Sequence, residues 1–460
     1  MELLGHTPDY SNTFNDKRLS RRANQIAYTL LMGRSSSVHG NTSNEADQKG
    51  FYRFLANDKV KESALINELT NRCSINCNNR DVLVIQDTSS IGLSHRAKSI
   101  KQESGLGMVG NKTGLGFLAH ISLVLDQDRE TMLGFSDVEL WHRTEDKANN
   151  TTGKYKKQSI EEKESYKWIK ASESSKNCLK QARHITVIED REGDIYEQFC
   201  LIPDKKTQLV IRSRDNRALG DGTKLHQALR EQKPLGDYTI IQYGDIRKNT
   251  IKREIAIEVR IKNVLFKKPK QCKNKNLPDQ LSVYVVEAKE KDKANGLCWR
   301  LITTKKTETF DQAKDIIEKY KMRWYIEQLF RLLKKQGYQI ESTELESGWS
   351  IRKLFVMVLN AALRVMQLYL AYDNEDSQDI SEVFKDEEIK CLNLIELKLR
   401  KTEKTINPFN PKKLAWASWI IARLGGWKGN AKQRRAGPII IKRGIDAFEN
   451  MFEGWQLSKL

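Results

Sequence analysis

The chain has 460 residues and a mass of 53.2 kDa, a size that predicts several structural units rather than one compact domain. Its hydrophobic content of 39% supplies material for real cores and excludes a disordered chain. Lys and Arg number 79 against 60 for Asp and Glu, so the net charge is +19. A surplus of this size favours a large polyanion as partner, nucleic acid above all and an anionic membrane surface only second.

We expect neither a targeting segment nor a membrane span in this sequence. The first twelve residues contain no basic segment followed by an apolar run, so we expect no signal peptide. The most apolar stretch, residues 354–372, carries Asn360 and Arg364 and predicts a buried helix rather than a membrane span. Seven scattered cysteines, with only Cys73 and Cys77 close together, give little support for structural zinc. We therefore expect a cytoplasmic, reduced protein without a membrane partner.

The N-terminal part of the chain carries a helical pattern. Over residues 13–72 apolar side chains recur at helical spacing, at Leu19, Ala23, Ile26 and Leu30. Arg18 and Arg21 lie among them, and Arg53 lies in a later aromatic stretch. Small helical units with basic residues beside aromatic ones suit contact with DNA phosphates, and a solvated basic face explains the same pattern equally well.

From residue 81 the pattern changes to strands. The run Val82–Ile85 is continuous and apolar, which is typical of a strand buried on both faces, and it ends at Gln86-Asp87-Thr88. We expect two further strands, a helix and a fourth strand after it, at residues 117–125, 131–140, 160–179 and 185–188. Asp190 follows the fourth strand.

A second group of strands is expected between residues 205 and 305. Short apolar runs predict five of them, at 209–212, 238–241, 255–264, 281–286 and 299–303. Helical character returns over 310–372, and the last ninety residues are mixed.

The most specific local pattern runs from Tyr320 to Lys334. In one continuous helix, an arc of roughly 80° contains the polar residues Tyr320, Arg323, Glu327, Arg331 and Lys334. The opposite side contains the apolar residues Ile326, Leu329, Phe330 and Leu333. Taken alone, this pattern favours an ordinary amphipathic helix, because Arg323 and Arg331 can satisfy Glu327 at four-residue spacing.

Three carboxylates from separate elements favour a functional interpretation. Asp87 and Asp190 each end a predicted buried strand, and Glu327 lies on the later helix. Either Asp alone could cap a turn. Phosphodiester cleavage with two divalent metals needs oxygen ligands that converge from separate elements, and carboxylates are the ligands that Mg²⁺ prefers. The three together, in the order strand, strand, helix, indicate a metal site.

These motifs resemble those of the DDE transposases of bacterial cut-and-paste insertion sequences, the IS-four family. The family signature is Tyr, two residues, Arg, three residues, Glu, six residues and Lys, which Tyr320, Arg323, Glu327 and Lys334 match without a gap. Gln86-Asp87-Thr88 resembles the first acidic motif, and residues 190–195 resemble the second. Further likenesses lie at residues 48–54, 139–143, 164–168 and 454–455, so the resemblance spans nearly the whole chain.

The resemblance implies a fold and a domain order. The fold is of the α/β class, with an RNase H-like catalytic core over residues 76–372 that is interrupted by a β-rich insertion at about 205–305. A helical domain at 1–75 is expected to bind the inverted-repeat ends of a mobile element. A mainly helical domain at 373–460 is expected to form a homodimer.

The resemblance also implies roles for single residues. Asp87, Asp190 and Glu327 become the catalytic and metal-binding triad, with Mg²⁺ or Mn²⁺ as cofactor and two ions in each site. Asp194 is the rival of Asp190, which we prefer because it directly ends the strand. Contacts to double-stranded DNA are expected from Tyr320, Arg323, Arg331, Lys334, Trp299, Arg212, Arg18, Arg21 and Arg53.

Three of these DNA contacts have special features. Trp299 matches a tryptophan that stacks on a flipped base when a DNA hairpin forms, and Arg212 matches a basic residue of the same site. Arg331 stands where the family has Lys, which keeps the charge and changes the hydrogen-bond geometry.

The expected activity is therefore DNA transposition, by metal-dependent excision through a hairpin and joining of the 3′ ends to target DNA. Two alternatives remain. An RNase H-like nuclease or resolvase would cut DNA without joining it, and a transposase-derived regulator would bind DNA without cutting. The complete triad and signature argue against the regulator.

Overall fold

In the computed structural model, the parts of the chain that are described are residues 8–32, 37–42, 44–100, 105–110, 114–143, 158–242, 253–291, 293, 296–334, 337–372, 374–400, 406–428 and 436–459. The helices are α1 Lys17–Met32, α2 Glu45–Ala56, α3 Glu62–Asn76, α6 Tyr166–Cys178, α7 Tyr196–Leu201, α8 Leu225–Arg230, α9 Phe310–Lys321, α10 Trp324–Leu333, α11 Gly348–Ala371, α12 Asp386–Leu399, α13 Leu414–Leu424 and α14 Pro438–Leu457. The strands are β1 Asp81–Gly92, β2 Gly107–Met108, β3 Leu115–Asp126, β4 Thr131–Trp141, β5 His184–Glu189, β6 Thr207–Arg212, β7 Gly236–Gln242, β8 Arg253–Lys267, β9 Gln280–Glu290 and β10 Cys298–Thr303.

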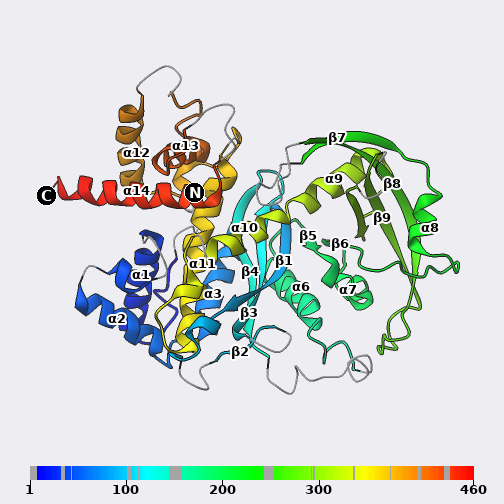
Figure 1. Ribbon diagram of the computed structural model, residues 1–460, viewed down its shortest axis with the longest axis horizontal. Coiled ribbons are helices and arrows are strands. Elements are labelled where there is room, and N and C mark those ends of the chain that lie inside the picture. Colours follow the sequence, from blue (N-terminus) through cyan, green and yellow to red (C-terminus); the bar gives the residue numbers. More distant parts are fainter. Residues whose placement is uncertain are drawn as a thin grey trace.

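One mixed sheet runs through the molecule (Figure 1). Its strand order is β2-β3-β1-β5-β6-β10-β9-β8-β7, and β4 pairs with β3 beside β2. The strands β4, β3 and β1 form an antiparallel meander, whereas β1, β5 and β6 are parallel. The later strands β7 to β10 continue the sheet because β10 pairs with β6. All nine long strands therefore agree with strands expected from the sequence.

The two faces of the sheet pack against different helices. Along β1, Leu83 and Ile85 belong to the core shared with α10 and α11, whereas Val82 and Val84 belong to the core shared with α6 and α7. This alternation follows from the period of two in a strand, and it explains why the run is apolar at every position. Any residue that continues the odd-numbered series along β1 points toward α10.

The helix α11 connects the terminal helices to the sheet (Figure 1). Its 24 residues are long and apolar enough to cross a membrane, but 94% of the most apolar window is buried in the fold. Its first half meets the N-terminal helices: Arg352 donates to both oxygens of Glu62, and the Lys353 ammonium donates to the backbone carbonyls of Leu55 and Asn57 at the end of α2. In its second half, Arg364 pairs with Glu388 and Glu449 of α12 and α14. The expected buried helix is confirmed.

Three sequence expectations were wrong in detail. The predicted helix at 160–179 begins only at Tyr166, because residues 160–165 form turns and Glu164 is held by two hydrogen bonds from Arg143 at the end of β4. The strand that contains Asp87 does not end there but runs to Gly92, paired with β3 along its length. What ends before Asp87 is the parallel pairing with β5, whose last partners are Ile85 and Ile188.

The third expectation, one helix from Tyr320 to Lys334, is also wrong. The helix is interrupted between α9 and α10 at Met322 and Arg323, where consecutive backbone hydrogen bonds span three residues instead of four. This tighter turn redirects α10 along β1 and leaves the Tyr320 side chain buried at the end of α9. The apolar side of α10 is buried as expected, at Ile326, Leu329, Phe330 and Leu333.

Candidate active site

Asp87 and Asp190 lie side by side at the end of the parallel ladder. Ile85 of β1 faces Ile188 of β5, and each Asp is two residues farther along its chain. Because side chains alternate, both Asp residues continue the series that faces α10. The even-numbered neighbour Gln86 points to the opposite face, where its amide donates to the Ser172 hydroxyl of α6 at 3.0 Å. The sheet therefore projects two carboxylates to one side.

Glu327 approaches from the first turn of α10, and Arg323 stands between it and β1. One guanidinium nitrogen (Nη1) of Arg323 lies 3.5 Å from Oδ2 of Asp87, and another (Nη2) is paired with Oε1 of Glu327. All three side chains are partly buried, with exposed fractions of 18% for Arg323, 21% for Asp87 and 34% for Glu327. One cation thus bridges carboxylates from two elements.

The pKa of Asp87 reflects the carboxylates and the cation around it. Burial raises the pKa of Asp87 to about 6. The Arg323 charge and a hydrogen bond from the Thr88 amide oppose the rise, whereas the carboxylates of Asp190 and Glu327 add to it. Two further carboxylates close enough to act on Asp87 make the site a concentration of negative charge.

The donor set of this site fits a hard divalent cation. Three carboxylates on a strand, a strand end and a helix supply oxygen ligands of the kind that Mg²⁺ takes. Within the described residues they do not form a closed ligand cluster, because the Arg323 guanidinium lies among them. The site has oxygen donors and negative charge, and the Arg323 guanidinium pairs with two of its carboxylates.

The neighbours of Asp190 are engaged in other contacts. Asp194 is fully buried and paired with Arg217, and it also accepts from the Arg214 amide at 2.8 Å. Glu189 is buried on the α6 side, where its carboxyl accepts from Ser172 and from Gln198. Asp190 itself is half-buried. Among the described residues, its Oδ1 accepts a hydrogen bond from the backbone amide of Glu192. The geometry supports the preference for Asp190 over Asp194.

Three residues expected to contact DNA form a group beside the carboxylates. The Trp299 and Tyr320 rings meet edge to face, with centroids 5.7 Å apart. Arg212 lies close enough to Tyr320 to influence its phenol, whose pKa burial raises. Trp299 and Arg212 are half-buried, whereas Tyr320 is buried with 5% exposed. The structure therefore brings these residues together from β10, α9 and β6.

The remaining predicted contacts differ in position. The Lys334 ammonium donates to the Ser89 hydroxyl of β1 at 2.7 Å, so Lys334 lies near Asp87. Arg331 is exposed on α10, away from the buried side of that helix. The N-terminal Arg18, Arg21 and Arg53 are also exposed, on α1 and α2. Arg18, Arg21 and Arg53 therefore lie on the N-terminal helices and not on the elements that carry the carboxylates.

Sequence reasoning missed Ser89 and the central position of Arg323. Ser89 is two residues after Asp87 on the same strand, so the period of two places both on one face. That spacing was available in the sequence. The Arg323 bridge between two elements was not, because it depends on the break between α9 and α10.

Two family matches accompany this geometry. Residues 11–60 match the family described as transposase DNA-binding, which covers α1 and α2. Residues 143–364 match the transposase DDE domain, which includes Asp190 and Glu327 and begins after Asp87. A cryo-EM structure described as the piggyBac transposase synaptic complex with hairpin DNA is similar over 99% of this chain and 79% of that chain, at 10% sequence identity and a TM-score of 0.36.

Proposed function

Because this chain is a DDE transposase, a metal-dependent enzyme that acts on DNA, we propose that it excises and reinserts a mobile element by cut-and-paste transposition. Its motifs resemble those of the IS-four family, to which the Tn-five transposase belongs. The observation that carries this proposal is the convergence of Asp87, Asp190 and Glu327 around Arg323 where the parallel ladder ends. An RNase H-like core is what a DDE domain implies for this sheet.

Asp87, Asp190 and Glu327 are the residues that would hold the metal, two Mg²⁺ or Mn²⁺ ions. Bound ions at such a site supply an activated water and stabilise the leaving oxygen of an in-line displacement. The rigid sheet and α10 keep the carboxylates in place for this task. Arg323 must leave the carboxylates when divalent cations take over their charge, and its planar donor fork then suits a phosphate of the DNA. Lys334 and Arg331 would add sequence-independent phosphate contacts.

The proposed reaction has four steps. Water cleaves one strand at the element end and leaves a 3′-hydroxyl. That hydroxyl attacks the opposite strand, which releases flanking DNA and closes a hairpin on the element. Water opens the hairpin, and the regenerated 3′-hydroxyls attack target DNA. The substrate DNA places a bacterial enzyme of this kind in the cytoplasm with the chromosome.

The test is incubation with DNA that carries the inverted repeats flanking the encoding gene, with Mg²⁺ or with EDTA. Wild type is expected to cleave only with the metal and to form a hairpin and joined product, and Glu327→Gln is expected to lose all three. Glu344→Gln, an exposed glutamate beyond α10, is the matched control and should act as wild type. Cutting without joining would indicate the nuclease alternative, and binding without cutting the regulator. Cutting by Glu327→Gln would show that the active site lies elsewhere.

Trp299 offers a test of the hairpin step. Its ring meets Tyr320 edge to face and is half-buried, so part of the indole is accessible. Stacking of a base on an aromatic ring is worth about 1–3 kcal/mol. Trp299→Ala is therefore expected to slow hairpin formation by roughly tenfold and to leave the first nick near the wild-type rate, measured on denaturing gels. Equal slowing of both steps would contradict the base-flipping role.

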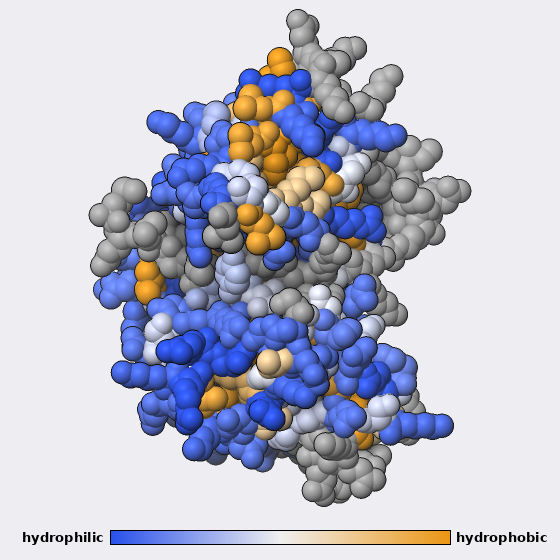
Figure 2. All heavy atoms as spheres, turned by 90° about the vertical axis from the view of Figure 1, so that its left-hand side faces the viewer, coloured by the Kyte–Doolittle hydropathy of each residue, from blue (hydrophilic) through white to orange (hydrophobic). Residues whose placement is uncertain are grey.

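We further propose that two copies form the synaptic complex through the C-terminal helices. Leu394 and Leu397 of α12, and Met451 and Leu457 of α14, are exposed apolar side chains. Figure 2 shows apolar atoms gathered in the upper part of the face where these helices lie, above a mostly hydrophilic lower part. Apolar area of this kind on a charged protein is suited to burial against a second copy.

A further inference from the structure

We propose that Arg22 reads a guanine in the major groove of the bound DNA end, and that Asp47 holds it in place for this purpose. This inference rests on the proposed binding of DNA ends and concerns which residues give that binding its sequence specificity. It starts from the exposed face of α1, which lies in the segment that matches a transposase DNA-binding family.

The exposed face of α1 has the composition of a DNA-reading helix. At 100° per residue, an arc of roughly 120° contains Arg18, Arg21, Arg22, Gln25, Tyr28 and Thr29. The opposite side packs into the core through Ala23, Ile26 and Leu30. An α-helix fits the major groove, and Arg and Gln are the side chains that read base edges there. The face can therefore offer both phosphate contacts and base contacts.

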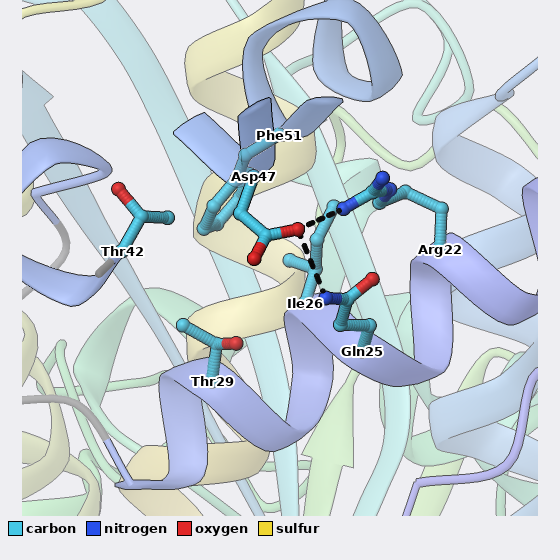
Figure 3. Close-up of a pocket in the computed structure, with 7 residues that line it drawn as sticks. All are labelled: Arg22, Gln25, Ile26, Thr29, Thr42, Asp47 and Phe51. Atoms are coloured by element: carbon cyan, nitrogen blue, oxygen red, sulfur yellow. Dashed lines mark hydrogen bonds and ion pairs between the residues drawn. The ribbon is translucent and has the colours of Figure 1, made fainter. Parts of the chain in front are cut away.

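Arg22 and Gln25 differ from Arg21 because both donate a hydrogen bond to the Asp47 carboxylate. Figure 3 shows the Asp47 carboxylate of α2 pointing between them. Its Oδ1 accepts from Nη1 of Arg22 at 3.0 Å and from Nε2 of Gln25 at 3.2 Å. The Arg22 side chain is still about one-third exposed. Arg22 thus keeps donors for another partner while one nitrogen is held.

Asp47 is itself held by the cap of α2. The Asn44 side chain accepts the Asp47 amide at 2.8 Å and donates to its Oδ2 at 2.8 Å. The hydrogen bonds from Asn44 and Arg22 keep the pKa of Asp47 below its usual value. A charged acceptor in the first turn of a helix is also favoured by the helix dipole. The support for Arg22 is therefore rigid and charged at neutral pH.

Gly50 leaves room for the Arg22 guanidinium beside α2. A Cβ at this position would lie 2.7 Å from the Arg22 Cζ, too close for any other residue without a shift. The guanidinium consequently lies against the backbone of α2 at Gly50, and Asp47 accepts a hydrogen bond from one of its edges. A planar donor fork is what bidentate hydrogen bonding to O6 and N7 of guanine requires.

Asp47 would be a poor choice on a surface that only attracted phosphates. A carboxylate next to the DNA repels the phosphate backbone and lowers sequence-independent affinity. Its presence is explained when it orders Arg22 in advance, because an arginine that is already ordered loses less side-chain entropy on binding.

The experiment measures affinity for an inverted-repeat end and for a scrambled duplex by fluorescence anisotropy. Asp47→Asn is expected to lower the ratio of the two affinities by about tenfold, the scale of one bidentate base contact, without weakening binding to scrambled DNA. Arg21→Ala, which removes an exposed arginine of the same helix, is the control and should weaken both affinities equally and reduce the salt dependence.

A chemical change in the DNA identifies the base. Replacing guanines one at a time by 7-deazaguanine removes the N7 acceptor, and at one position wild type should lose about tenfold in affinity while Arg22→Ala loses nothing further. Equal sensitivity of wild type and Arg22→Ala at every guanine would overturn the proposal. So would an unchanged affinity ratio in a folded Asp47→Asn protein, which would leave Asp47 as a structural link between two helices. If wild type itself does not prefer its ends, end recognition in the proposed function fails as well.

Discussion

Asp190→Asn is expected to abolish DNA cleavage and to leave the fold intact. Asp194→Asn is expected to destabilise the fold and to leave cleavage by the folded protein unchanged. Asp190 is half-buried at the ladder end, and its recorded contact in the described chain is a local backbone amide. An amide in its place keeps that hydrogen bond and loses the charge that a metal needs. Loss of such a charge from a transition-state site costs roughly three orders of magnitude in rate.

Asp194 has a structural role by the same geometry. It is fully buried and paired with Arg217, which in turn lies over the Phe266 ring with 5.1 Å between the guanidinium carbon and the ring centre. Removing one partner of a buried pair leaves the other charge without compensation and costs about 3–5 kcal/mol. Asp194→Asn should therefore lower the thermal midpoint of unfolding, and the protein that stays folded should still cleave.

Both variants are compared in a cleavage assay with Mg²⁺ and by thermal unfolding followed by circular dichroism. Glu192→Gln is the matched control, since Glu192 is an exposed acid beside Asp190 with a weak ion pair to Lys167 at 3.4 Å. It should change neither measurement appreciably. A stable, inactive Asp194→Asn protein together with an active Asp190→Asn protein would reverse the assignment of the second carboxylate.

Arg364→Met is expected to destabilise the protein by about 3–5 kcal/mol, because it leaves two buried carboxylates without their shared cation. Arg364 donates to Glu388 at 2.6 Å and to Glu449 at 3.3 Å, and all three side chains are at least nine-tenths buried. The loss should appear in the free energy of unfolding, with little change in the intrinsic cleavage rate of the folded fraction.

This effect is expected to depend on pH. Burial raises the pKa of Glu449 to about 8, against the opposing charge of Arg364 and with the help of Glu388. A carboxyl whose pKa is higher in the folded state stabilises the fold fully below its unfolded pKa, and that contribution is lost as the pH rises through the folded value. Stability should therefore fall from about pH 4.5 to about pH 8 in wild type, and the fall should continue to higher pH in Arg364→Met, because loss of the opposing charge raises the pKa of Glu449 further.

A triple variant separates charge from shape. Replacing Arg364, Glu388 and Glu449 together by Met, Leu and Met removes the charges and keeps apolar volume, a change that is often neutral or stabilising. We expect it to recover most of the stability lost in Arg364→Met and to lose the pH dependence. A triple variant as unstable as the single one would mean that packing around Arg364, and not its charge, holds α11 to α12 and α14.

Much of the secondary structure was predictable because its patterns are local. The strands at 81–92, 115–126 and 184–189 each contain a continuous apolar run, and the spacing of Tyr320, Arg323, Glu327 and Lys334 predicted a DDE transposase. Asp87 and Asp190 could be selected because each follows an apolar run. The start of α6, the end of β1 and the single helix over Tyr320 and Lys334 were predicted wrongly, since periodicity does not show where pairing ends or where a tight turn interrupts a helix.

The sequence by itself determined the strands, because apolar runs and their periods are properties of neighbouring residues, and its motif spacing predicted a DDE transposase with Asp87, Asp190 and Glu327 as its carboxylates. Tertiary structure alone decided which acid near Asp190 is buried in an ion pair, how Arg323 bridges Asp87 and Glu327, and how Asp47 holds Arg22. Each of these contacts joins residues whose distance in space depends on how helices and strands pack. Burial and charge pairing act over a few ångströms, and the fold sets those distances.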